Sequence, residues 1–301
     1  MKRLAALLAA TALTATSFAP THTHTQTVTA HYEQRTALKQ ATPDKQTLRE
    51  ALTSHGLRAS LIDSALAGAQ LDERVINRYN KPRTTQYRSS DKSFEERVQA
   101  VINHPNYQRV NQQLPHHALQ HLDELLALEQ TTGVDYRYIT AIHGLESRFG
   151  EVTGEHQLIN TYLSRWHVTP GSRQVQRELR ALLAWTDKNR VDATQLNTIN
   201  SSWASAFGAM QTRAENLHLL EASSLEELNQ PRVAHEFIAT YLTQNYRWGA
   251  NSNWRRTRNH QPLQPRSGNA LAIQAYNNSD VYVQTIIHLA EQLPTSQELT
   301  P

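Results

Sequence analysis

Apolar residues recur along most of the chain at spacings of three and four residues, which is the period of an amphipathic helix. No run of strand-like segments with alternating apolar and polar residues is present, and neither is a glycine-rich phosphate loop or an internal repeat. The sequence therefore predicts an all-α fold. The predicted helices lie in these segments: Thr47 to Ala67, Phe94 to Ile102, Leu114 to Thr131, Asp135 to Gly150, Glu178 to Trp185, Pro231 to Tyr246 and Ala270 to Leu293.

Glycines and polar runs interrupt this pattern and divide it into elements. Gly56 breaks the first segment, which predicts a short pair of helices in place of one long helix. A polar run over 277–280 breaks the last segment, and its serine or its aspartate can cap the helix that follows. The stretches 81–91 and 248–268 are polar and irregular, so we expect a linker and a loop there.

The first thirty residues have the pattern of a secretory signal peptide. Two basic residues precede an apolar run from Leu4 to Leu13, and small residues follow it. The run is too short to span a bilayer as a mature helix. We expect residues 1–30 to be a signal peptide and linker, with the cleavage point left open between Ala19 and Ala30, and the mature protein to be periplasmic or secreted.

The composition suits one large or two small globular domains. The formal net charge of the 301 residues is +3, and part of it lies in the leader, so we expect no binding to nucleic acid. The chain has no cysteine, which excludes disulfides, thiolate metal sites, a cysteine nucleophile and a lipid anchor on cysteine. No later apolar run reaches membrane length, so we expect a mature protein without a transmembrane segment, and a monomer.

Glu146 is the residue most suited to chemistry. It lies at the edge of the apolar face of its helix, where loss of water favours the protonated form that a general acid needs. Gly144 would let a ligand or another backbone approach the carboxyl group, and Gly150 can end the helix so that Glu146 lies in its last turn. Periodicity alone also fits a solvated or capping glutamate. The apolar face consists of Tyr138, Ile142, Leu145 and Phe149.

Three motifs follow one another along the chain. Residues 144–150 read Gly-Leu-Glu-Ser-Arg-Phe-Gly, residues 202–211 read Ser-Trp-Ala-Ser-Ala-Phe-Gly-Ala-Met-Gln, and residues 276–279 read Tyr-Asn-Asn-Ser. They are similar to Gly-Val-Glu-Thr-Arg-Trp-Gly, Ser-Phe-Ala-Gly-Ala-Met-Gly-X-X-Gln and Tyr-Asn-X-Ser of the lytic murein transglycosylase B family, which belongs to the lysozyme-like superfamily. The resemblance implies a lysozyme-like catalytic domain over 93–293, preceded by an N-terminal helical segment over 45–92.

The resemblance implies peptidoglycan as the substrate, cleaved at the MurNAc–GlcNAc β-1,4 bond without a cofactor. Glu146 matches the family's catalytic glutamate, which would protonate the leaving oxygen and then take the proton from the C6 hydroxyl of the same MurNAc. The product would be a 1,6-anhydro sugar. One carboxyl group would act as acid and then as base, unlike the carboxylate pair of ordinary glycosidases.

Five further residues match substrate-binding positions of the family. Ser202 and Gln211 match groups that hydrogen-bond the sugar or the reacting centre, Tyr276 matches a cleft aromatic, and Asn277 supports that turn. Tyr87 resembles a sugar-stacking tyrosine, although its spacing from the catalytic glutamate is longer here. Structural readings stay open: a helix cap for Ser202, an exposed amide for Gln211 and core packing for Tyr276.

The sequence departs from the family after the second motif. Residues 212–216 read Thr-Arg-Ala-Glu-Asn, where the family has Phe-Met-Pro-Ser-Ser, and no aspartate-rich calcium loop follows, so we expect no calcium site. The altered segment leaves open a non-catalytic peptidoglycan-binding module. A lysozyme-type hydrolase, in which water replaces the C6 hydroxyl, is the nearer alternative.

The fifteen histidines invite a metal-binding interpretation. His117 and His121 are four residues apart on one predicted helix, next to His116. The sequence offers no convincing third ligand or supporting hydrogen-bond partner, so we expect no metal site. We interpret His143 as a helix-surface or groove residue.

Overall fold

The structure is a computed structural model and describes residues 45–81, 92–244, 248 and 268–299. Helices dominate these ranges, and their only sheet is the antiparallel pair β1 (His156–Gln157) and β2 (Asn200–Ser201). The predicted all-α fold class is confirmed. The predicted signal peptide over 1–30 and Tyr87 lie outside the described residues.

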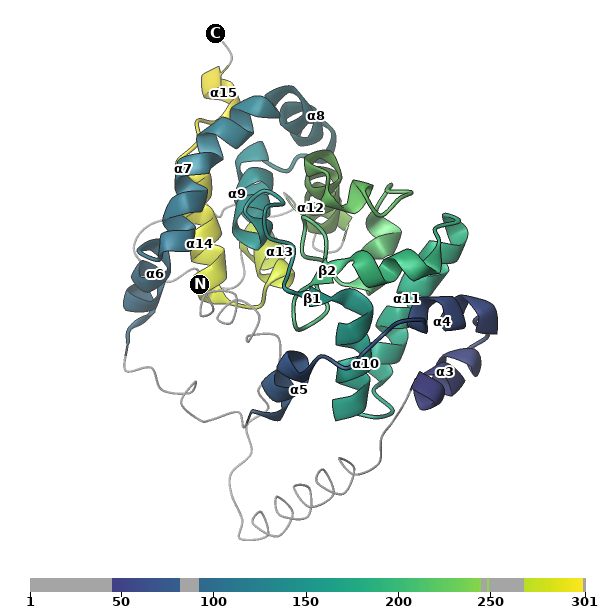
Figure 1. The fold of residues 1–301 in the computed structure, drawn as a ribbon. Helices are drawn as coiled ribbons and strands as arrows, with labels where there is room; N and C mark the ends of the chain where they lie inside the picture. The colour runs from purple at the N-terminus through teal and green to yellow at the C-terminus, as the bar shows by residue number, and fades with distance from the viewer. Residues whose placement is uncertain (1–44, 82–91, 245–247, 249–267, 300–301) are drawn as a thin grey trace.

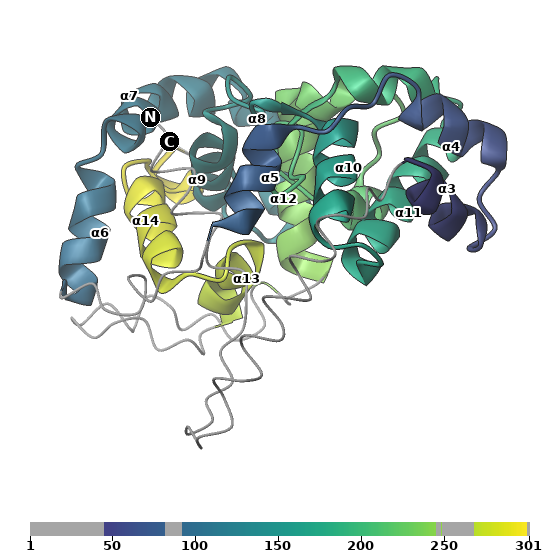
Figure 2. The same cartoon turned by 60° about the horizontal axis from the view of Figure 1, so that its bottom comes forward.

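The N-terminal segment forms three short helices, and the break at Gly56 separates the first two as predicted. Gly56 has a φ of +83°, a conformation that glycine adopts without strain. In Figures 1 and 2, the first two helices lie beside α11 and the third lies beside α10. The elements are α3 (Lys45–Thr53), α4 (Ala59–Leu66), α5 (Glu73–Asn80), α10 (Leu158–Val168) and α11 (Arg173–Lys188).

The central helix of the fold is α9 (Tyr136–Ser147), and nearly all of its residues are buried. Both views place it between α14 and α12, and α7 and α8 also pack against it. A helix surrounded in this way holds its side chains in rigid positions, which a catalytic group needs. The surrounding helices are α7 (Pro105–Gln120), α8 (Leu122–Thr132), α12 (Pro231–Gln244) and α14 (Asp280–Ala290).

The helix predicted over Leu114 to Thr131 is two helices, α7 and α8, which meet at His121. The buried face of α7 includes Tyr107 and Val110, so the helix extends nine residues before the predicted start. Pro105 opens it at a first-turn position, where a missing N–H costs no helical hydrogen bond. Helix α10 was not predicted, and α5 was covered only by the N-terminal helical segment over 45–92, because their apolar positions are short runs without a clear period.

Several predicted boundaries are confirmed. Helix α6 (Phe94–Ile102) has the predicted ends, and α12 begins at Pro231. The Ser279 side chain accepts a hydrogen bond from the Tyr282 amide and caps α14, which makes it the cap in place of Asp280. The remaining elements are η2 (Ala193–Thr198), η3 (Ala214–Leu219), η4 (Glu227–Asn229), α13 (Gly268–Tyr276) and α15 (Ser296–Leu299).

One hydrophobic core joins the N-terminal helices to the rest of the described chain. Leu48, Leu52 and Ile62 belong to the same buried cluster as Ile142 of α9 and Ile286 of α14. Across the described ranges, none of the helices combines the length and the apolar character needed to cross a membrane.

Candidate active site

Glu146 lies in the last turn of α9, at the point where the chain reverses. The helix ends at Ser147, and Arg148 and Phe149 both have left-handed backbone conformations, with φ of 51° and 60°. Gly150 continues this turn with a φ of 90°. Successive left-handed residues other than glycine are uncommon and cluster at functional sites. The left-handed turn therefore begins two residues earlier than Gly150, and it leaves Glu146 at the rim of the helix bundle.

Gly144 has a different role from the one predicted. A Cβ atom at this position would lie 2.7 Å from Cζ of Phe149 and 2.8 Å from Cγ1 of Val110. The missing side chain therefore makes room for the phenyl ring of Phe149, which folds back over the helix after the turn. The expectation that a ligand or another backbone approaches here is wrong, because protein side chains fill the space.

The Glu146 carboxyl group is partly buried and has a defined partner. The Tyr282 hydroxyl donates a hydrogen bond to Glu146 Oε1 at 2.7 Å. Burial raises the pKa of Glu146 to about 7, while the hydrogen bond from Tyr282 acts in the opposite direction. At neutral pH the group is therefore present in both its acid and its base forms.

Tyr282 is a site residue that the sequence analysis missed. It lies in the first turn of α14 and is fully buried. Its phenolic group reaches a carboxyl group 136 residues earlier in the chain. The only feature of the sequence that could have indicated Tyr282 is its position three residues after Ser279. That position places it in the first turn of the helix that follows Tyr276 and Asn277.

Tyr276 connects the third motif to the second. Its hydroxyl donates a hydrogen bond to the Met210 carbonyl oxygen at 2.6 Å, and its ring meets that of Tyr241 edge to face at 5.1 Å. Burial and the nearby charge of Glu146 raise its pKa well above the ordinary value. Tyr276 therefore lies near Glu146, as predicted, and it also packs in the core, as the alternative interpretation held. The Asn277 carbonyl oxygen accepts a hydrogen bond from the amide of Ser279 at 2.7 Å and shapes the turn.

Ser202 and Gln211 stabilise the loop of the second motif. The Ser202 hydroxyl accepts hydrogen bonds from the amides of Ala204 and Ala206 at 3.3 and 3.1 Å, so it caps a loop, not a helix. The Gln211 side-chain amide donates to the carbonyl oxygens of Thr153 at 2.9 Å and of Gly208 at 3.1 Å. Gln211 is therefore not the exposed amide of the alternative reading.

These hydrogen bonds bring the three motifs to one place. Gln211 joins the second motif to the chain that follows α9, Tyr276 joins the third motif to the second, and Tyr282 joins α14 to Glu146. The partly buried Glu146 carboxyl group thus lies at a helix end that hydrogen bonds connect to the loop of the second motif and to the turn of the third.

The comparison with known families agrees with this arrangement. Residues 40–263 match the family described as the transglycosylase SLT domain. The chain belongs to this family. The resemblance inferred from the three motifs is thereby confirmed. No curated protein matches the chain.

Three solved structures share the lysozyme-like helical fold of this SLT domain. The soluble lytic transglycosylase SltB1 from Pseudomonas aeruginosa is 17% identical, with a TM-score of 0.64, over 82% of this chain and 97% of that chain. Escherichia coli Slt35 in complex with bulgecin A is 17% identical, with a TM-score of 0.62, over 83% and 92%. Pseudomonas aeruginosa SltB3 in complex with NAG-anhNAM-pentapeptide is 20% identical, with a TM-score of 0.62, over 86% and 78%.

A buried ion pair holds the second motif of this SLT domain against α10 and α11. Arg165 Nη1 donates to Glu178 Oε2 at 2.6 Å, to the Ser205 hydroxyl at 2.8 Å and to the Ala204 carbonyl oxygen at 3.3 Å. Both charged side chains are almost completely buried. The sequence analysis missed this pair, because opposite charges thirteen residues apart on two helices have no distinctive spacing.

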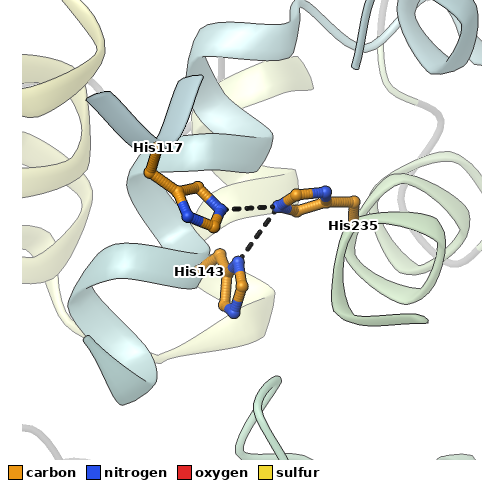
Figure 3. Close-up of side chains that lie close together, drawn as sticks. All are labelled: His117, His143 and His235. Carbon is orange, nitrogen blue, oxygen red and sulfur yellow. Dashed lines mark hydrogen bonds between the residues drawn. The ribbon is translucent and has the colours of Figure 1, made fainter. Parts of the chain in front are cut away.

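A group of histidines lies behind Glu146 in the SLT domain. His143 is fully buried, three residues before Glu146, so its interpretation as a helix-surface or groove residue is wrong. Its neighbours are His117 of α7 and His235 of α12 (Figure 3). Burial lowers the pKa of His117 to about 3 and also lowers those of His143 and His235, so all three imidazoles are neutral at pH 7.

Proposed function

We propose that this SLT domain is a lytic transglycosylase that cleaves the MurNAc–GlcNAc β-1,4 bond of peptidoglycan and leaves a 1,6-anhydroMurNAc end. The observation that carries the proposal is the Glu146 carboxyl group, whose pKa is raised to about 7 by burial. In the described part of the chain, only burial and the Tyr282 hydroxyl shift that pKa, and no second carboxylate contributes. A glycosidase with paired carboxylates would place the second one about 5–10 Å away.

The chemistry follows from one group in two protonation states. Protonated Glu146 donates its proton to the glycosidic oxygen as the bond to C1 of MurNAc breaks. The resulting carboxylate then takes the proton of the C6 hydroxyl, whose oxygen attacks C1 and closes the anhydro ring. A pKa close to the working pH serves both steps, because acid and base are then equally accessible. The Tyr282 hydroxyl donates to Oε1, and we assign the proton transfers to Oε2.

The loop of the second motif and the turn of the third are the proposed sugar-binding walls. The Ser202 hydroxyl accepts two backbone hydrogen bonds, which leaves its own hydrogen for an acceptor on the sugar. Gln211 uses its amide hydrogens on backbone carbonyls, which leaves its side-chain oxygen for a sugar hydroxyl. Tyr276 and Asn277 position the opposite turn. We further propose export to the periplasm or beyond, on the basis of the leader pattern in residues 1–30.

Digestion of purified peptidoglycan tests the proposal. We expect the wild type to release muropeptides whose MurNAc ends lack one water relative to reducing ends, as measured by mass spectrometry. We expect Glu146→Gln to abolish release and to keep binding to the insoluble polymer. The exposed Glu151 provides a matched control, and Glu151→Gln should retain full release.

Two outcomes would contradict the proposal in different ways. Reducing MurNAc ends in the wild-type digest would indicate a hydrolase of the lysozyme type. Equal yields of soluble muropeptides from the wild type and Glu146→Gln would indicate that this carboxyl group does no chemistry, which would favour a binding module.

A further inference from the structure

Three histidines from three different helices meet in the core behind the catalytic turn (Figure 3). His117 Nε2 lies 3.1 Å from His235 Nε2, and His143 Nδ1 lies 3.0 Å from the same atom. The exposed fractions of the three residues are 8%, 0% and 0%. Each of them offers a ring nitrogen within 4.8 Å of those of the other two. The side chains converge although they are distant in sequence.

Hydrogen bonding within this group leaves polar atoms unsatisfied. The Nδ1–H of His235 donates to Glu124 Oε1 at 2.7 Å, so a neutral His235 has a single lone pair, on Nε2. Two ring nitrogens approach that lone pair, which can accept one well-directed hydrogen bond. At least one of these two ring nitrogens is therefore left without a hydrogen bond to His235, and buried unsatisfied groups are uncommon. His143 Nε2 also lacks a partner among the described residues, but it points away from His235.

The separations suit a metal ion at the point of convergence. Zinc binds histidine nitrogen at about 2.0–2.1 Å in tetrahedral geometry, which places two ligand nitrogens about 3.3 Å apart. The two closest separations, 3.0 and 3.1 Å, differ from that value by a few tenths of an ångström. A small outward movement of the rings would therefore accommodate the ion, and each nitrogen would direct its lone pair to the ion in place of another ring.

Glu124 supplies the support that metal-binding histidines usually have. Histidine ligands typically donate their second ring N–H to a carboxylate, which fixes the tautomer, and His235 does so here. The Glu124 charge also balances part of the charge of a buried cation. Phe149 stacks on the ring of His117 at 4.2 Å and closes one side of the group.

We propose that His117, His143 and His235 form a binding site for a divalent transition-metal ion, with zinc as the best match. Imidazole ligands suit zinc and its neighbours in the first transition series, whereas calcium and magnesium prefer oxygen. The ion would tie α7, α9 and α12 together directly behind the turn that carries Glu146. Water would take the fourth position, as it does at zinc sites with three histidine ligands.

The proposal reverses the expectation drawn from the sequence. That expectation depended on the lack of a third ligand and of a supporting carboxylate. The structure instead joins His117 to one histidine from α9 and one from α12, and provides the carboxylate from α8. Neither is visible from the spacing of His117 and His121, because the other ligands lie on helices that only the tertiary fold brings close.

Metal binding by the untagged full chain tests the site. The protein is stripped with a chelator, mixed with one equivalent of zinc, desalted and analysed for retained metal. We expect about one zinc ion per chain and a higher melting temperature than that of the stripped protein. Cobalt in place of zinc should give the intense visible absorption of a tetrahedral site. No retained zinc together with an unchanged melting temperature would overturn the proposal.

Variants separate this site from histidines on the surface. We expect His143→Ala and His235→Ala to lose stoichiometric zinc binding, and Glu124→Gln to weaken it by about 10- to 100-fold. The matched control is His116→Ala, because His116 is exposed and adjacent to a proposed ligand. Equal loss in His116→Ala would place the metal on the surface and overturn the proposal. The cobalt spectrum of the wild type decides the matter if a core variant fails to fold.

Discussion

Glu146 and Tyr282 show how two residues can divide one task. The position of Glu146 at the end of α9 removes water from the carboxyl group and raises its pKa to about 7. The hydroxyl of Tyr282 holds one carboxyl oxygen at 2.7 Å and so sets the direction of the other. Desolvation alone would give a weak acid without a fixed orientation, and the hydrogen bond alone would favour the charged form. Together they give an oriented group that can both donate and accept a proton.

Tyr282→Phe should separate orientation from acidity. We expect muropeptide release to fall by about 10- to 100-fold, because a hydrogen bond to an ionisable group contributes about 1.5–3 kcal/mol. The hydroxyl lowers the pKa of Glu146, so its removal should raise that pKa and shift the alkaline limb of the pH–rate profile to higher pH. Initial rates across a pH series measure both effects. Tyr107→Phe, which alters a buried phenol bonded to His288, is the control and should keep the wild-type profile. An unchanged limb in Tyr282→Phe would contradict this role.

Glu146→Gln should change the pH dependence of stability. The folded-state pKa of about 7 lies above the ordinary value of 4.5, so the folded protein holds this proton more tightly than the unfolded chain. The wild type therefore loses stability as pH rises from 4.5 through 7, by up to about 3 kcal/mol. Glutamine does not titrate, so the variant should be more stable than the wild type at pH 8 and similar to it at pH 4. Urea unfolding at both pH values measures the difference, and a constant difference between them would contradict the raised pKa.

At the scale of elements, the loop that carries Ser202 is held by α10 and α11, two helices that carry none of the site residues named around Glu146. The guanidinium of Arg165 on α10 binds Glu178 on α11 and two groups of the loop. The pair is buried, so its partners are costly to separate but add little net stability as a pair. The pair acts by position, because it fixes where the 202–211 loop lies relative to α10 and α11.

Arg165→Met tests whether the protein depends on this buried ion pair. We expect a loss of about 3–5 kcal/mol in the free energy of unfolding, because the variant leaves the Glu178 carboxylate buried without its main partner. Urea unfolding followed by circular dichroism measures the loss. The control is Arg58→Met, which breaks an exposed pair with Asp187 and should cost at most about 1 kcal/mol. Similar losses in the two variants would show that the buried pair has no special role.

At the scale of the whole molecule, the N-terminal helices belong to the same folding unit as the site. Their apolar residues share one buried cluster with α9 and α14. Polar contacts cross the same boundary: the Trp166 indole donates to the Thr47 hydroxyl at 3.1 Å, and the Asp72 amide donates to the Ser164 hydroxyl at 2.7 Å. Helix α10, which carries Trp166 and Ser164, also carries Arg165, so the N-terminal helices support the loop of Ser202 indirectly.

Removal of residues 45–81 should therefore destabilise the whole protein. We expect the truncated chain to aggregate or to melt at a clearly lower temperature, because it exposes the apolar surface of α10 and α11 that the N-terminal helices cover. Thermal unfolding followed by circular dichroism, together with gel filtration, measures the effect. A monomeric truncated chain with the wild-type melting temperature would contradict a shared core.

The sequence by itself determined the properties that depend on local order. The period of the apolar residues predicted the helical class, Gly150 suggested that Glu146 lies in a last turn, and the polar run predicted a cap at Ser279 or Asp280, because helix formation and capping involve residues only a few positions apart. The three motifs identified the family, because each one is a short run of consecutive residues. The packing role of Gly144 and the burial of His143 were misjudged, because neither depends on neighbours along the chain alone.

Only the tertiary structure decided which distant groups meet. Tyr282 reaches Glu146 across 136 residues, and His235 meets His143 across 92. The Arg165–Glu178 pair on neighbouring helices likewise depends on how α10 packs against α11. Such contacts arise because one shared core fixes the relative positions of whole helices. How side chains of different helices pack together cannot be predicted from the spacing of residues along the sequence.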